Sequence, residues 1–183
     1  LGPSKRAIEA IKKCASEINI YPDGGGYYLK RALAEKLGLE KEKIILGNGS
    51  DEIVSLITRV FLQKDEEAIM GDPSFLMYKI DSQLSQARIL SIPLDNFRLN
   101  LPAMAKAITS KTKLIFISNP NNPTGTIVKE KEVKKLITIC AQAVQRNGSL
   151  DIHQLPYLEV VLKLPHSGQI LQLFLCLKSG QNH

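Results

Sequence analysis

The 183-residue sequence has little that indicates a membrane protein, a secreted protein or a nucleic-acid-binding protein. No apolar run reaches about 18 residues, so we expect no membrane span, and no signal peptide is visible. The net charge is +6, but Lys and Arg are scattered among Glu and Asp, without a basic tract or an aromatic platform. We therefore interpret these charges as solvated helix faces and expect no nucleic-acid partner.

Cysteine is scarce as well. Cys14, Cys140 and Cys176 are odd in number, far apart and free of any CxxC spacing. This pattern argues against a disulfide framework and against a zinc site, and it favours reduced thiols. We expect a cytoplasmic protein that holds no metal.

What the sequence does contain is an alternation of helical and strand patterns. Apolar residues at helical spacing predict helices over residues 3–18, 27–37 (with Gly38 as its C-terminal glycine), 50–63, 101–108 and 129–144. Short apolar runs predict strands at 43–48 and 87–94 and in the first parts of 66–75 and 112–125. Strands that alternate with helices predict an α/β fold with a mostly parallel sheet flanked by helices.

The composition changes near residue 142. Six of the nine glutamines and all three histidines lie from that point on, whereas acidic residues nearly vanish. We therefore separate residues 1–140 from a tail, residues 141–183. Two interpretations of the tail stay open: a poorly matched end of the domain, or a frameshifted or truncated stretch that is not the native coding sequence.

The run GNGSDE, residues 47–52, places a glycine turn directly before a predicted helix. Backbone N–H groups in the first turn of a helix lack intrahelical partners, and with the helix dipole they can hold an anion such as phosphate. Ser50 is a candidate helix cap. Asp51 and Glu52 would repel an anion unless they point away, so a plain capped helix is the alternative. The run matches neither GxGxxG nor GxxxxGK[ST], and a dinucleotide or nucleoside triphosphate is not indicated.

The run SNPNNPTG, residues 118–125, follows the clearest predicted strand. Ligands of open α/β sheets bind outside the carboxyl ends of the strands. Asparagine amides can donate hydrogen bonds to an oxyanion without titrating. The alternative is an ordinary Asn/Pro/Gly turn.

Six segments in order carry a resemblance to a known family: LGPS, YPDGG, LKRALAEKLGL, GNGSDE, DPSFLMY and SNPNNPTG. Together they resemble the histidinol-phosphate aminotransferases, pyridoxal-phosphate enzymes with the aspartate-aminotransferase fold, over residues 1–140. The resemblance implies that these residues form the N-terminal segment and the first, incomplete part of the cofactor-binding large domain. A related cobalamin-pathway enzyme, threonine-phosphate decarboxylase, shares the general pattern and is kept as an alternative.

The resemblance implies pyridoxal 5′-phosphate as the cofactor and assigns residues to it. The backbone N–H groups of Ser50 and Asp51 would hold its phosphate, Phe75 would stack on its ring, and the Asn122 amide would donate to its phenolic oxygen. Tyr21 would reach the phosphate in the neighbouring subunit, which implies a homodimer. For Tyr21 and Phe75 the alternative is ordinary core packing. The resemblance also implies a cis peptide bond between Asn122 and Pro123.

The implied reaction moves an amino group between glutamate and a small-molecule substrate, imidazole-acetol phosphate, in histidine biosynthesis. The family also needs an aspartate for the pyridine nitrogen, a Schiff-base lysine and later arginines, and these motifs are not readable here. Asp151 and Lys178 lie near the expected spacings, but their neighbours do not match. We identify no catalytic residue. An inactive, non-catalytic truncated product is therefore a hypothesis beside the enzyme, and whether this chain is active stays open.

Overall fold

The computed structural model describes residues 2–146 and 171–176. The chain divides into two compact units, Leu1–Leu46 and Gly47–His183, and each unit is described by itself. No helix of the described residues is long and apolar enough to cross a membrane.

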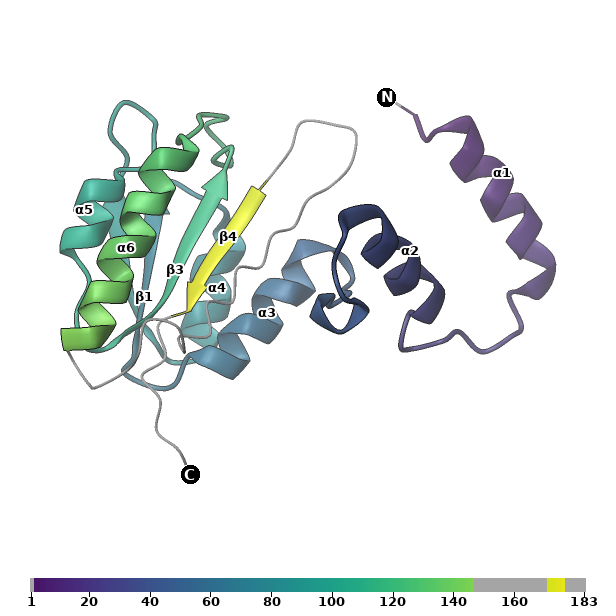
Figure 1. The fold of residues 1–183 in the computed structure, drawn as a ribbon, viewed down its shortest axis with the longest axis horizontal. Coiled ribbons are helices and arrows are strands. Elements are labelled where there is room, and N and C mark those ends of the chain that lie inside the picture. The colour runs from purple at the N-terminus through teal and green to yellow at the C-terminus, as the bar shows by residue number, and fades with distance from the viewer. Residues whose placement is uncertain (1, 147–170, 177–183) are drawn as a thin grey trace. The chain divides into compact units, whose positions relative to one another are not determined.

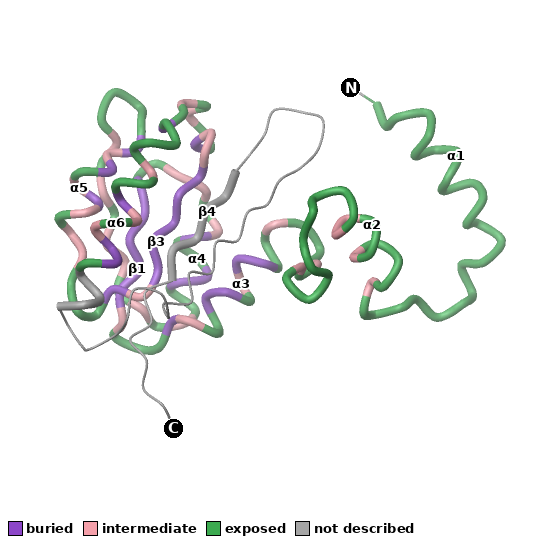
Figure 2. The backbone as a smooth tube through the Cα atoms, in the orientation of Figure 1, coloured by how far each residue is buried: buried purple, intermediate pink, exposed green. Residues whose placement is uncertain are grey.

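The first unit consists of helices: α1 (Lys5–Cys14), the 3₁₀ turn η1 (Ala15–Glu17), α2 (Tyr27–Leu37) and the 3₁₀ turn η2 (Lys41–Lys43). Ser4 caps α1, since its side chain accepts a hydrogen bond of 3.2 Å from the Ala7 N–H. Gly38 ends α2 with a φ of 65°, as predicted for a C-terminal glycine. Neither α1 nor α2 buries a residue within the described part of the chain, and both lie in the exposed and intermediate colours of Figure 2.

The predicted strand at residues 43–48 is wrong. The segment leaves η2 in an irregular conformation, and the side chain of Ile45 is 62% exposed. A strand needs a neighbour for its backbone groups and a covered face for its apolar side chains. Among the described residues no strand pairs with this segment, so its apolar composition does not produce a strand.

The second unit is built on a sheet. Its strands are β1 (Glu67–Asp72), β2 (Arg88–Pro93), β3 (Thr112–Asn119) and β4 (Leu171–Cys176), and within the described residues their order is β2-β1-β3-β4. β1 pairs in parallel with both β2 and β3. The helices are α3 (Gly49–Phe61), α4 (Leu76–Leu84), α5 (Leu101–Lys106) and α6 (Glu130–Arg146). The predicted α/β fold with a mostly parallel sheet is confirmed.

The two faces of the sheet pack against different helices (Figure 1). Ala68, Met70, Leu114 and Phe116 form a core with α3 and α4, whereas the alternate strand residues pack on α5 and α6: Ile69, Ile115 and Ile117. Successive strand residues point to opposite faces, and a strand covered on both sides must be apolar throughout. Figure 2 shows β1 and β3 buried along most of their length for this reason.

The cysteines differ in environment. Cys14 is free and exposed, and Cys140 is free and buried in the core between α6 and the sheet. Burial raises the pKa of the Cys140 thiol to about 12, so this thiol stays protonated at neutral pH. Cys176 lies in β4, where only the backbone is described.

The strand β4 was not predicted. It runs antiparallel to β3, with Leu171 opposite Asn119 and Cys176 opposite Leu114. A strand that follows a helix in a β-α-β unit is normally parallel to the strand before it. Here residues 147–170 separate α6 from β4. β4 covers the edge of β3, which would otherwise present unpaired N–H and C=O groups.

We expect a proline in β4 to expose this edge in a position-dependent way. Neighbouring residues of an edge strand alternate between bonding the next strand and facing away from it. We compare Leu173→Pro with Phe174→Pro. One of these prolines removes an N–H group that bonds β3, and the other removes an N–H group that faces away from β3 and serves as the matched control. Light scattering and size-exclusion chromatography should show larger assemblies for one variant only. Equal behaviour of the two variants would contradict the pairing of β4 with β3.

Candidate cofactor site

Two loops lie next to each other at the carboxyl edge of the sheet. One follows β1 at residues 73–75, and the other follows β3 at residues 120–125. Because β1 and β3 are parallel neighbours, their carboxyl ends meet at the same edge. The first loop carries Phe75 and the second carries Asn122.

A buried asparagine joins these loops. Asn121 is 2% exposed. Its Nδ2 donates to the Pro73 carbonyl oxygen at 3.2 Å and to Thr124 Oγ1 at 2.9 Å, while its Oδ1 accepts from Ser74 Oγ at 3.0 Å. Its backbone carbonyl also accepts a hydrogen bond of 2.7 Å from the Gly125 N–H, which closes the turn. The two loops are therefore held by one side chain.

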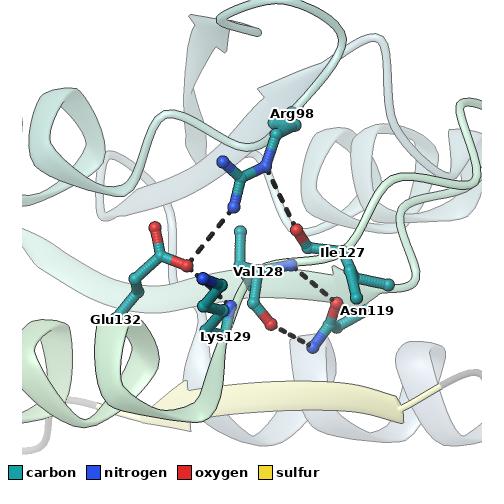
Figure 3. Close-up of polar contacts among 6 residues, drawn as sticks. All are labelled: Arg98, Asn119, Ile127, Val128, Lys129 and Glu132. Carbon is teal, nitrogen blue, oxygen red and sulfur yellow. Dashed lines mark hydrogen bonds and ion pairs between the residues drawn. The ribbon is translucent and has the colours of Figure 1, made fainter.

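A second set of contacts holds the chain where the 120–125 loop returns to α6 (Figure 3). Asn119 Nδ2 donates to the Val128 carbonyl oxygen and Asn119 Oδ1 accepts from the Val128 N–H, both at 3.0 Å. Arg98 Nε donates to the Ile127 carbonyl oxygen at 3.2 Å, and its guanidinium pairs with Glu132 at 3.3 Å. The base of the loop is thereby fixed to the sheet.

Phe75 lies directly before α4 and is half-buried. Its ring meets Tyr78 edge-to-face, with centroids 5.5 Å apart, and Tyr78 in turn stacks on Phe116 at 4.5 Å. Burial raises the pKa of Tyr78 well above its usual value, so its hydroxyl stays neutral. The core thus contacts the Phe75 ring on the Tyr78 side, and the half-buried residue stays partly accessible. Phe75 is thus partly packed in the core, and its stacking on the cofactor ring stays a prediction.

The start of α3 differs from the sequence prediction. The helix begins at Gly49, which has a φ of 75°, and Asn48 precedes it. The prediction that Ser50 caps the helix is wrong, because Ser50 lies inside the first turn, where its hydroxyl donates to Asp51 Oδ1 at 3.4 Å. The Asn48 N–H donates to Glu52 Oε2 at 2.6 Å instead. Glu52 therefore stays beside the helix start, where its charge weakens the attraction for an anion.

The N–H groups of Ser50 and Asp51 remain candidates for a phosphate, since first-turn N–H groups have no intrahelical acceptor. The end of α3 at Phe61 is joined by a short segment to the start of β1 at Glu67. That these N–H groups, Asn122 and Phe75 converge on one crevice stays a prediction.

The remaining candidates have the following places. Asn122 is exposed, in contrast to the buried Asn121 beside it, and the bond between Asn122 and Pro123 is cis, as predicted. Tyr21 lies between η1 and α2 and is 93% exposed, so core packing of Tyr21 is wrong within the described part of the first unit. Asp151 and Lys178 lie outside the described residues. No group of acidic, histidine or cysteine side chains in the described part of the chain could hold a metal ion.

The family model of class I and II aminotransferases matches residues 1–145. This chain belongs to the class I and II aminotransferase family. The chain is 47% identical over 128 residues to the histidinol-phosphate aminotransferase of Moorella thermoacetica, covering 70% of this chain and 33% of that relative. It is 42% identical over 138 residues to histidinol-phosphate aminotransferase 2 of Hydrogenovibrio crunogenus, covering 75% and 37%. The chain thus spans about a third of the length of these relatives.

Solved structures of the family have the same fold. Histidinol-phosphate aminotransferase from Sinorhizobium meliloti, in complex with pyridoxal 5′-phosphate, matches with a TM-score of 0.72 and 23% identity over 75% of this chain and 38% of that one. Alanine aminotransferase from Pyrococcus furiosus matches with a TM-score of 0.72 and 21% identity over 78% and 39%. The predicted resemblance to this family is confirmed.

The sequence analysis of this aminotransferase-family chain did not predict that Ser74 and Asn121 join the two loops. Both lie inside segments that carried the resemblance, one residue from Phe75 and from Asn122. The available signal was the second asparagine of the 118–125 run, which a plain turn does not require.

We expect Asn119→Ala to destabilise the fold by about 2 kcal/mol, because it leaves both backbone groups of Val128 unpaired. Arg98→Ala should cost less than about 1 kcal/mol, because its side chain is 46% exposed and solvent competes for its partners. Urea unfolding measures both changes as midpoint shifts at constant slope. A larger loss for Arg98→Ala than for Asn119→Ala would contradict this ranking.

Proposed function

We propose that this chain is part of a pyridoxal-phosphate-dependent aminotransferase that moves an amino group between glutamate and imidazole-acetol phosphate. The curated relatives named above support this substrate, and they favour amino transfer over the related decarboxylation. The observation that carries the proposal is the junction of the Phe75 and Asn122 loops at the carboxyl ends of β1 and β3. We place the protein in the cytoplasm and expect a homodimer.

The donor set of the described residues fits the phosphate end and one ring face of the cofactor. The Ser50 and Asp51 N–H groups suit a phosphate, the Asn122 amide suits an anionic phenolic oxygen, and the accessible part of Phe75 suits an aromatic ring. When bound, pyridoxal phosphate supplies an electron sink for the amino transfer. The chain's own residues bind and orient it, and Tyr21 is proposed to reach the phosphate held by a second copy.

A second candidate, a non-catalytic product that keeps part of the cofactor cradle, is favoured by the direction of β4. Cys176, the last described residue, pairs with Leu114 near the amino end of β3. Asn122 follows the opposite end of β3, about 17 Å away at the rise of a strand. Lys178 follows Cys176 by two residues. We therefore propose that the described part of β4 runs away from the cofactor site, while Lys178 itself lies outside the described residues.

We expect the chain to bind 4′-deoxypyridoxine 5′-phosphate, an analogue without the aldehyde that would label surface lysines. Phe75→Ala and Asn122→Ala should each weaken binding by about tenfold, the effect of losing one good contact. The exposed Leu76→Ala and Gln83→Ala are matched controls on α4 and should bind as the unchanged chain does. Isothermal calorimetry measures these affinities. If both single variants, Phe75→Ala and Asn122→Ala, bind the analogue as tightly as the unchanged chain does, the site assignment is wrong.

We also expect borohydride reduction of the chain with pyridoxal phosphate to link the cofactor to no single lysine. We propose that amino transfer from glutamate to imidazole-acetol phosphate then stays at the background of free cofactor, because we identify no lysine among the described residues that could act as its acid and base. Peptide mapping identifies the labelled residues, with Lys163→Ala as the control for Lys178→Ala. Stoichiometric labelling of Lys178, lost together with turnover in Lys178→Ala, would show the tail to be a working half-site.

A further inference from the structure

A hydrogen bond joins Ser74 and Asn121, the residues directly before the two proposed ring contacts of the cofactor. Ser74 directly precedes Phe75, and Asn121 directly precedes Asn122. The Ser74 hydroxyl and the Asn121 amide oxygen are 3.0 Å apart, although 47 residues separate them along the chain. A movement of one loop relative to the other must therefore stretch or break this hydrogen bond.

Every polar atom of the Asn121 side chain has a partner. The amide nitrogen serves both loops, through the Pro73 carbonyl on one and Thr124 on the other, while the amide oxygen serves Ser74. A buried amide whose oxygen and nitrogen are both hydrogen-bonded is held in place, and its removal leaves the partner groups unsatisfied. Aspartate has nearly the same shape, but it lacks both N–H donors and would place a charge against the Pro73 carbonyl oxygen.

We propose that Asn121 is a positioning residue which, with Ser74, fixes the Phe75 ring relative to the Asn122 amide. This inference rests on the proposed function, since it assigns the two contacts to one cofactor ring. The pair, called here the Ser74–Asn121 clamp, makes none of its hydrogen bonds to the start of α3. The clamp therefore sets affinity for the ring and leaves affinity for the phosphate unaffected.

The difference between ring and phosphate provides the test. The affinities of the chain for 4′-deoxypyridoxine 5′-phosphate and for inorganic phosphate are measured for Ser74→Ala and for Asn121→Asp. Affinity for the ring analogue should fall at least about threefold in Ser74→Ala and about tenfold in Asn121→Asp, as expected for one and for several lost hydrogen bonds. Affinity for inorganic phosphate should stay unchanged in both variants.

Ser55→Ala is the matched control. Ser55 is also a half-buried serine whose hydroxyl donates to a buried side chain, Asp81 Oδ1, at 2.8 Å, but it joins α3 to α4. Its replacement also removes one tertiary hydrogen bond donated by a serine, here to a carboxylate oxygen. We expect a loss of stability at least as large as that of Ser74→Ala and no change in the ratio of the two affinities.

The absorption of the bound analogue gives a second readout that a general loss of stability does not move. A hydrogen bond from Asn122 to the phenolic oxygen favours its anionic form and lowers the pKa of the phenol. When the clamp is broken, this pKa should rise toward that of the free analogue. The Ser55→Ala variant should keep the value of the unchanged chain.

The outcomes separate the two proposals. If the unchanged chain binds the analogue and the clamp variants behave as Ser55→Ala does, the positioning role is overturned while the proposed function stands. If the unchanged chain does not bind the analogue, the proposed function fails and the clamp fails with it. If Asn121→Asp does not fold, Ser74→Ala decides alone, since it removes a single hydrogen bond and leaves the Asn121 amide nitrogen bonded.

Discussion

The parallel pairing of β1 with β3 is the constraint on which the candidate site depends. Parallel neighbours end at the same edge, so the residues that follow them meet whatever their distance in the sequence. The pairing is possible because both strands are covered on both faces, with Ala68 and Phe116 toward α3 and α4 and Ile69 and Ile115 toward α5 and α6. The core therefore places the two loops, and the polar contacts of Asn121 adjust them within that frame.

Electrostatics act in opposite directions at this edge. The start of α3 offers backbone N–H groups to an anion, yet Glu52 is held there by the Asn48 N–H. The Asn121 and Asn122 amides are neutral, so the 120–125 loop adds donors without adding charge. At the proposed site, the cofactor would therefore be oriented by neutral hydrogen-bond donors more than attracted by net charge.

Sequence reasoning located most elements of the second unit because their patterns are local. β1 and β3 each contain a short apolar run, and α6 repeats apolar residues at helical spacing. It was wrong at residues 43–48, where an apolar run pairs with no strand of the described residues. It was also wrong at Ser50, which lies inside the first turn of α3 and does not cap it. β4 and the role of Asn121 depend on partners far away in the sequence, and the local spacing of apolar and polar residues does not indicate such partners.

The sequence distance spanned by the Ser74–Asn121 clamp also orders the events of folding. Closing a loop of this size costs chain entropy, and that cost is recovered only when the strands on either side have paired. The two loops therefore cannot hold their relative positions before β1 and β3 have paired. A ligand that recognises both loops distinguishes the assembled sheet from every partly folded form, so its binding reports the completion of folding rather than the presence of any single helix or strand.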